Sequence, residues 1–320
     1  MIRAGIIGGA GYTAGELIRL LLNHPGAEIA WVHSTSNAGN PVSDVHGGLF
    51  GDTDMVFSDS YNLENVDVVF LCSGHGKSTE FWQQNTLPDG LKVIDLAQDF
   101  RDESAGYVYG LPECNRSRIA GARLVANPGC FATAIQLALL PLAAAGKLHG
   151  DVNVTGITGS TGAGVKPGAT THFSWRNDNL SVYKPFTHQH LKEIGMTLGQ
   201  LEPGCDAQIN FVPVRGDFPR GIFAVTTVTT DLTADEARRL YEDYYATAAF
   251  THVMPRAVDL KQVVNTNKCL LQLEKNGDKL LIVSCIDNLL KGASGQAVQN
   301  MNLIFGLPEK TGLMLKPSAF

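Results

Sequence analysis

The chain has 320 residues, of which 44% are hydrophobic and 18% charged, a composition typical of a soluble globular protein with one large or two ordinary domains. The net charge of −6 comes without a basic block, which argues against nucleic acid as a partner. The longest apolar run, Ile135–Ala145, is broken by Gln136 and Pro141 and is too short to span a bilayer, so we expect no membrane partner.

Short apolar runs alternate with helical patterns in the first third of the chain. The first helical pattern stops at Asn23-His24-Pro25-Gly26, because proline and glycine both end helices. This alternation predicts an α/β fold with a Rossmann-type doubly wound parallel sheet. The predicted strands are Ile2–Ile7, Ile29–Val32, Val66–Leu71, Val93–Leu96 and Leu124–Val125, and the predicted helices are Ala14–Leu22 and Ser78–Gln84.

The pattern changes after Cys130 to longer strands, which predicts a second α+β domain with a mainly antiparallel sheet. Asn276-Gly277 indicates a hairpin with positive φ at both turn positions. Thr233 and Glu236 have the spacing of a capping box for a helix over Ala234–Ala246. The predicted strands are Val152–Thr158, Gln208–Val214, Gly221–Thr230, Lys268–Glu274 and Leu280–Ile286.

The C-terminal segment again has a helical pattern, with Ala297, Met301 and Ile304 on one face. We expect this last helix to pack back on the first domain. The predicted dinucleotide-binding Rossmann domain is therefore discontinuous and comprises residues 1–129 and 294–320, and the catalytic and oligomerisation domain comprises residues 130–293.

The glycine-rich stretch after the first predicted strand indicates a dinucleotide site. Gly8 permits the tight turn, Gly11 lets the backbone approach a pyrophosphate, and Ala14 lets helix and strand pack closely. The alternative is a simple tight turn between a strand and a helix. The second strand leads into His33-Ser34-Thr35-Ser36-Asn37 without a carboxylate to repel a 2′-phosphate, which favours NADP(H) over NAD unless this is a polar loop without function.

Cys130 follows Asn127-Pro128-Gly129 and opens a helical pattern, where the partial positive charge of a helix N-terminus stabilises a thiolate. It is a candidate nucleophile, although cysteine often serves as a small buried packing residue. The six cysteines are scattered without a C-x-x-C pair, which argues against a disulfide framework and favours a reduced, cytoplasmic protein.

His188, His190 and Glu193 could supply a general acid/base and a carboxylate that orients an imidazole. The alternatives are two solvated loop histidines or a zinc site, for which other clustered ligands are missing, so we expect no metal.

Two further segments could bind an anion. The glycine-rich loop 159–168 contains Ser160 and could present backbone N–H groups, or it could be a flexible turn. Arg101 could recognise a planar anion or form a surface salt bridge.

Taken together, these stretches resemble the N-acyl-γ-glutamyl-phosphate reductase family, relatives of aspartate-semialdehyde dehydrogenase. The resemblance covers nearly the whole chain and rests most on "NPGC", "HQHLKEI" and "DNLLKGASGQAVQN". One departure is Val214, which stands where the family tends to have histidine, so this loop could handle a slightly different substrate, or its chemistry could lie on Arg215.

The resemblance implies NADPH-dependent reduction of an acyl phosphate in arginine biosynthesis through a Cys130 thioester. His190 is the expected acid/base, with His188 second and Glu193 orienting. N-acetyl is the usual acyl group of the family and N-succinyl the alternative, and we expect a homodimer or homotetramer. The implied cofactor contacts are Gly8, Gly11, Tyr12, Thr13, Ala14, Ser34, Ser36, Ser73, Asn288 and Gly292, and the implied substrate contacts are Arg101, Ser160, Gly162, Arg215 and Arg220.

Two other function classes compete with this reading. A cofactor-free cysteine hydrolase or acyltransferase would not need the glycine-rich opening. A catalytically silent NADP-binding sensor would not need Cys130 and the histidine pair.

Overall fold

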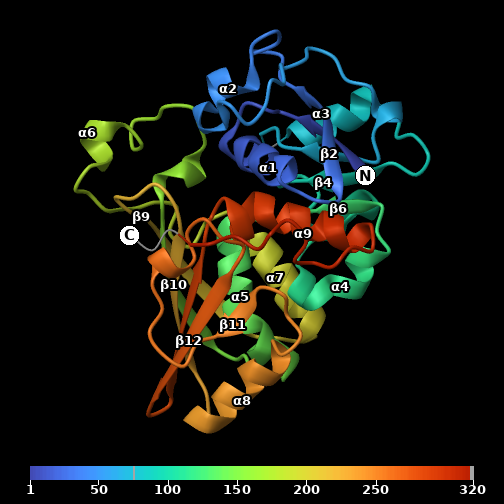
Figure 1. The fold of residues 1–320 in the computed structure, drawn as a ribbon. Coiled ribbons are helices and arrows are strands. Elements are labelled where there is room, and N and C mark those ends of the chain that lie inside the picture. The colour runs from blue at the N-terminus through green and yellow to red at the C-terminus, as the bar shows by residue number, and fades with distance from the viewer. Residues whose placement is uncertain (75, 318–320) are drawn as a thin grey trace. The chain divides into compact units, whose positions relative to one another are not determined.

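The computed structural model describes residues 1–74 and 76–317, which divide into two compact units, each built around its own sheet (Figure 1). Unit 1 comprises Met1–Pro128 and Ala293–Met314. Unit 2 comprises Gly129–Gly292 together with the described residues from Leu315 onward. None of the helices formed by the described residues has both the length and the apolar character needed to cross a membrane.

Unit 1 contains a six-stranded sheet in the order β2-β1-β3-β4-β6-β5, with every neighbouring pair parallel. The predicted doubly wound parallel sheet is confirmed, and β5 is an addition whose two residues are too few to show a pattern. The strand order reverses between β1 and β3, and ligands bind such sheets at this point, outside the carboxyl ends of the strands. The strands are β1 (Ile2–Ile7), β2 (Ala27–His33), β3 (Val68–Leu71), β4 (Lys92–Asp95), β5 (Val108–Tyr109) and β6 (Leu124–Ala126).

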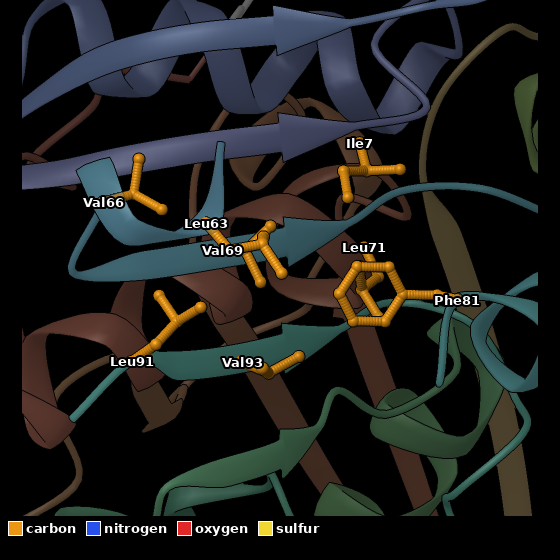
Figure 2. Packing of buried hydrophobic residues seen from close by; sticks show 8 residues of the cluster. All are labelled: Ile7, Leu63, Val66, Val69, Leu71, Phe81, Leu91 and Val93. Atoms are coloured by element: carbon orange, nitrogen blue, oxygen red, sulfur yellow. The ribbon is translucent and has the colours of Figure 1, made fainter. Parts of the chain in front are cut away.

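Helices pack on this sheet through buried aliphatic side chains. One buried cluster lies between β1, β3, β4 and α3 (Lys77–Gln84), and Figure 2 shows its eight members. The C-terminal helix α9 (Gly295–Ile304) contacts α1 (Tyr12–Leu22), α4 (Pro112–Ala120) and β4. Helix α1 starts two residues earlier than predicted, which places Tyr12 and Thr13 in its first turn.

Unit 2 contains a seven-stranded sheet in the order β11-β12-β13-β10-β7-β9-β8. The pairs β11-β12 and β7-β9 are parallel and the others antiparallel, so the predicted mainly antiparallel sheet is confirmed. The strands are β7 (Asp151–Thr158), β8 (Ser181–Val182), β9 (Gln208–Arg215), β10 (Ile222–Thr229), β11 (Thr251–Val253), β12 (Cys269–Asn276) and β13 (Lys279–Ile286).

The hairpin between β12 and β13 is present, but its turn lies one residue later than predicted. Asn276 pairs with Lys279, so Gly277 and Asp278 form the turn. Gly277 has φ +55°, while Asn276 belongs to the strand and keeps a negative φ. The pairing of the two strands fixes the register, and glycine supplies the left-handed conformation at the first turn position.

Helix α5 (Cys130–Ala144) forms the core of unit 2 and contacts β10, β13, α7 (His190–Leu201) and α8 (Ala234–Tyr244) (Figure 1). Every residue from 131 to 143 is buried, which is expected of a helix that is apolar on all sides. Pro141 has no N–H for the carbonyl of Leu137, and the Tyr245 hydroxyl donates a 2.6 Å hydrogen bond to that carbonyl instead. Helix α8 has the predicted Thr233–Glu236 capping box.

Candidate active site

Cys130 is the first residue of α5, directly after the extended N-cap Gly129. The N-cap glycine has no side chain to cap the helix, and the positive end of the helix dipole favours a thiolate at the first position. The thiol is half-buried and forms no disulfide. Cys285, in contrast, is fully buried. Burial raises the pKa of its thiol and keeps it protonated, so this cysteine is not a candidate nucleophile.

Gly292 packs directly against Cys130. A Cβ atom at position 292 would lie 2.8 Å from the Cβ of Cys130 and 3.1 Å from its Cα. Real Cβ atoms do not approach that closely, so glycine is required here to leave room for the cysteine. This contact is a reason for the glycine that the sequence did not indicate, and its cofactor role stays a prediction.

Glu193 connects the backbone before Cys130 with one of the two histidines. Its Oε2 accepts a 3.0 Å hydrogen bond from the N–H of Gly129, and its Oε1 lies 3.9 Å from Nε2 of His190. Glu193 and His190 are 5% and 7% exposed, so this carboxylate acts in a largely water-free environment. It therefore holds the N-cap of α5 and faces the imidazole at the same time.

The contacts of His188 fix its tautomer and its charge. Nδ1 of His188 accepts a 3.3 Å hydrogen bond from the N–H of His190, which leaves the ring proton on Nε2. Burial, and then the nearby charge of Lys184, lower the pKa of His188 to about 4. His188 is consequently neutral at neutral pH. Both rings make edge contacts with Phe131, the residue after Cys130.

The glycine-rich turn of unit 1 has the geometry of a phosphate cradle. Gly8 has φ +82°, and a Cβ there would lie 2.7 Å from the backbone nitrogen of Ser73, so this turn requires glycine. At Gly11 the nearest atom to such a Cβ is 4.0 Å away, so the surface above the start of α1 is open. Helix α1 has no side-chain cap, which leaves its first N–H groups for an anion. The turn therefore fits a dinucleotide pyrophosphate.

The other predicted cofactor residues of unit 1 are grouped around this turn and β2. Ser73 follows β3 and meets Gly8, and Ala14 is fully buried against the core. Tyr12 is 42% exposed at the start of α1. Ser34 and Ser36 follow β2, and the Asn37 amide lies 3.4 and 3.0 Å from their hydroxyls, respectively. Thr13 also lies in the first turn of α1.

The loop that contains Ser160 and Gly162 is a short 3₁₀ turn, Ser160–Ala163, rather than an open set of donors. The N–H groups of Gly159, Ser160 and Thr161 already donate to carbonyls of residues 218–221. Free backbone N–H groups are therefore not available at these three positions, which corrects the expected source of anion binding here. The half-buried Ser160 side chain remains a candidate for such a contact.

The remaining predicted residues have partners in their own units. Arg101, in unit 1, donates to the carbonyls of Asn127 at 2.9 Å and Leu96 at 3.0 Å. The Asn288 side chain accepts from the N–H of Gly221 at 2.7 Å and donates to Thr161 at 3.0 Å.

Arg215 and Arg220 both belong to unit 2. Sequence reasoning assigned no role to two residues that contact them: Arg176, which belongs to no motif, and Asp287, which opens the DNLLKGASGQAVQN stretch but lies far along the chain from Arg220. Across residues 1–74 and 76–317, no group of three potential metal ligands comes together.

Comparison with known proteins identifies the family. Residues 3–122 match "Semialdehyde dehydrogenase, NAD binding domain", and residues 130–288 match "Semialdehyde dehydrogenase, dimerisation domain". The N-acetyl-gamma-glutamyl-phosphate reductase of Bacteroides fragilis is 62% identical and that of Christiangramia forsetii 54% identical, each over 100% of both chains.

Solved structures share the fold at low sequence identity. Aspartate semialdehyde dehydrogenase II from Vibrio cholerae, complexed with ASA, has a TM-score of 0.76 at 17% identity, covering 96% of this chain and 98% of that one. The Candida albicans enzyme with NADP has a TM-score of 0.73 at 16% identity, covering 95% and 98%. The full-length relatives confirm the resemblance predicted from the motifs, and the chain belongs to the N-acetyl-gamma-glutamyl-phosphate reductase family within the semialdehyde dehydrogenases.

Proposed function

We propose that the protein reduces N-acetyl-γ-glutamyl phosphate to N-acetyl-L-glutamate 5-semialdehyde with NADPH in arginine biosynthesis. The observation that carries the proposal is the arrangement at the start of α5. Cys130 occupies the first helical position, and Glu193 both binds the N–H of Gly129 and faces His190. The names of the full-length relatives agree with this reaction.

In the first half of the reaction, the Cys130 thiolate attacks the acyl carbon of the substrate. A carbon–sulfur bond forms, the carbon–oxygen bond to phosphate breaks, and phosphate leaves with the electron pair. The resulting thioester is more electrophilic than a carboxylate, and a thiolate is also a good leaving group in the second half.

We assign proton transfer to His190. Neutral His188 accepts the backbone N–H of His190 and is suited to holding that residue in place. His190 would donate a proton to the oxyanion that hydride addition to the thioester leaves, and would take that proton back when the thiohemiacetal on Cys130 collapses, as the carbon–sulfur bond breaks, the aldehyde forms and Cys130 leaves as the thiolate. Glu193 stabilises the imidazolium that results. Arg101, Ser160, Gly162, Arg215 and Arg220 are the proposed substrate contacts.

We propose unit 1 as the NADP(H)-binding domain, and unit 2 as the catalytic and oligomerisation domain. Gly8, Gly11 and the first turn of α1 would hold the pyrophosphate, and Ser34 and Ser36 would hold the 2′-phosphate. When bound, the cofactor supplies the hydride that reduces the thioester. The absence of a carboxylate in 33–37 supports NADP over NAD, so kcat/KM should be higher with NADP. By resemblance, Asn288 and Gly292 would contact the nicotinamide end.

The test runs the reaction in reverse. Purified protein receives N-acetylglutamate semialdehyde, phosphate and NADP⁺, and NADPH absorbance is followed. We expect turnover that requires phosphate, disappears in Cys130→Ser and persists in the control Cys205→Ser, which alters a thiol outside the site. Turnover without phosphate, or an active Cys130→Ser variant, contradicts the mechanism. Tight NADPH binding without turnover supports the sensor alternative.

Three finer points belong to the same proposal. Comparing kcat/KM for the N-acetyl and N-succinyl semialdehydes identifies the acyl group. The dimerisation-domain match supports a homodimer or homotetramer, which light scattering would distinguish. None of the six cysteines, all of which the structure describes, forms a disulfide, which supports a reducing, cytoplasmic location.

A further inference from the structure

Two arginines of the proposed substrate site, Arg215 and Arg220, have different electrostatic environments. Arg220 is paired, since its Nε and Nη2 atoms lie 3.1 and 3.0 Å from Oδ2 of Asp287. Asp287 is fully buried and also accepts the N–H of Asn265 at 2.7 Å. The buried carboxylate thus neutralises the charge of Arg220, and that guanidinium is committed to holding the turn at Asp287.

Arg215 has no such partner. Among the residues that the structure describes, no carboxylate lies within ion-pair distance of its guanidinium, and its buried Nε has no hydrogen-bond acceptor. Its guanidinium makes a long 3.4 Å hydrogen bond to the Thr170 hydroxyl, lies 4.6 Å from the ring centre of Tyr183 and interacts with the hydroxyl of that tyrosine, all of which are uncharged partners. An uncompensated, half-buried guanidinium with an unused donor is suited to an oxyanion.

The position of Arg215 is fixed by Arg176, which is 5% exposed. The five N–H donors of Arg176 all bond to neutral acceptors, and one of them bonds to the carbonyl of Arg215 at 2.7 Å. The other four bond to the loop before β8 and to the first residue of β8, through the Thr170 carbonyl, the Asn179 carbonyl and the Ser181 hydroxyl. Arg176 therefore has no donor left for a ligand, and its role is to hold the end of β9.

Tyr183, which lies under the guanidinium of Arg215, also interacts electrostatically with the thiol of Cys130. Burial, and then the charge of Cys130, raise the pKa of Tyr183 to about 12, so the tyrosine under Arg215 stays protonated. The guanidinium of Arg215 and the thiol of Cys130 thus have a common neighbour within unit 2.

We propose that Arg215 recognises an oxyanion of the substrate and that Arg176 is the positioning residue that holds Arg215 for this task. The proposal rests on the proposed function and narrows it, because it separates Arg215 from Arg220. The oxyanion is either a carboxylate of the acylglutamate part or the phosphate group. In the reverse reaction these two belong to different reactants, and kinetics can distinguish them.

The first experiment measures KM separately for N-acetylglutamate semialdehyde, phosphate and NADP⁺ in Arg215→Met and Arg176→Lys. We expect a rise of roughly 10- to 100-fold in one oxyanion KM for Arg215→Met, the range for loss of a charged hydrogen bond. The KM for NADP⁺ should not change. A rise for the semialdehyde identifies the carboxylate, and a rise for phosphate identifies the phosphate. If both stay within about twofold of wild type, the assignment of Arg215 is wrong.

Arg176→Lys should raise the same KM with little change in kcat, because lysine cannot make the five bonds that hold Arg215. A fall in kcat alone would mean that Arg176 has only a structural role. The control is Arg239→Lys, which changes an exposed arginine on α8. If Arg176→Lys does not fold, Arg215→Met still tests the anion assignment.

A second measurement does not depend on turnover. Calorimetric binding of N-acetylglutamate and of inorganic phosphate is compared between wild type and Arg215→Met. Weaker binding of one ligand by the variant supports the assignment of Arg215 as an oxyanion-binding residue. A lack of reductase activity in the wild type would contradict the proposed function but not this assignment. Equal binding of both ligands by the two proteins contradicts the assignment.

Discussion

Replacing Asp95 with asparagine should make the stability of the protein less dependent on pH. Asp95 ends β4 and is fully buried. Its Oδ1 accepts hydrogen bonds of 2.8 Å from both the Ser78 hydroxyl and the N–H of Ala97, whereas its buried Oδ2 has no partner. Burial dominates over these hydrogen bonds and raises the pKa of Asp95 from 3.8 to about 6.

The protonation of Asp95 is linked to folding, and this linkage sets the direction and the magnitude of the change in the free energy of unfolding with pH. Because the folded protein holds this proton more tightly than the unfolded chain, the stabilisation is complete below pH 3.8 and is lost as the pH rises through about 6. The rise in the pKa of Asp95 from 3.8 to about 6 corresponds to a stabilisation of about 3 kcal/mol, of which roughly 2 kcal/mol is lost between about pH 4 and pH 8.

The assay is urea unfolding of the wild type and Asp95→Asn at those two pH values, followed by tryptophan fluorescence. The free energy of unfolding of the variant minus that of the wild type should increase by roughly 2 kcal/mol from the lower to the higher pH. A change in stability that the asparagine amide causes equally at both pH values cancels in this comparison. Asp89→Asn, at an exposed site, is the matched control. A difference that is the same at both pH values would refute the reasoning.

Three further predictions concern the site. Gly292→Ala should lower kcat at least about tenfold, because its new methyl group would displace Cys130, and iodoacetamide labelling should show altered reactivity of that thiol. Gly8→Ala should raise the KM for NADPH at least about tenfold, since a side chain at φ +82° would meet Ser73. His190→Asn should lower kcat by roughly 10²- to 10⁴-fold, and a wild-type pH–rate profile in that variant would contradict the assignment.

Local patterns in the sequence predicted the longer strands of both sheets, but not the short strands β5, β8 and β11, whose two or three residues show no pattern. The turn at Gly8 and the helix start at Cys130 depend on neighbouring residues, so their spacing predicts them. The capping box at Thr233 is local in the same way. Even so, the hairpin turn shifted by one residue at Gly277, because strand register decides which residue occupies the turn.

Features that depend on distant pairing could not be predicted from the sequence. Arg220 and Asp287 are 67 positions apart, so nothing local indicates that one neutralises the other. Arg176 belongs to no motif, and its partners come from three separate segments of the chain. The sequence of the loop at Ser160 indicated several free N–H donors. Their acceptors are carbonyls of residues 218–221, which lie almost sixty positions further along the chain and could not be identified from the local sequence.

Pro141 within α5 links the residue choice at position 141 to that at position 245. The proline deprives the carbonyl of Leu137 of its helical partner, and the Tyr245 hydroxyl compensates at 2.6 Å. Replacing the tyrosine with phenylalanine would leave a buried carbonyl unsatisfied, whereas replacing the proline with alanine would make that hydroxyl redundant. The two positions are therefore expected to covary among relatives, with tyrosine retained wherever proline occurs. The helix that begins at Cys130 would thus depend for one of its backbone hydrogen bonds on a residue more than a hundred positions away.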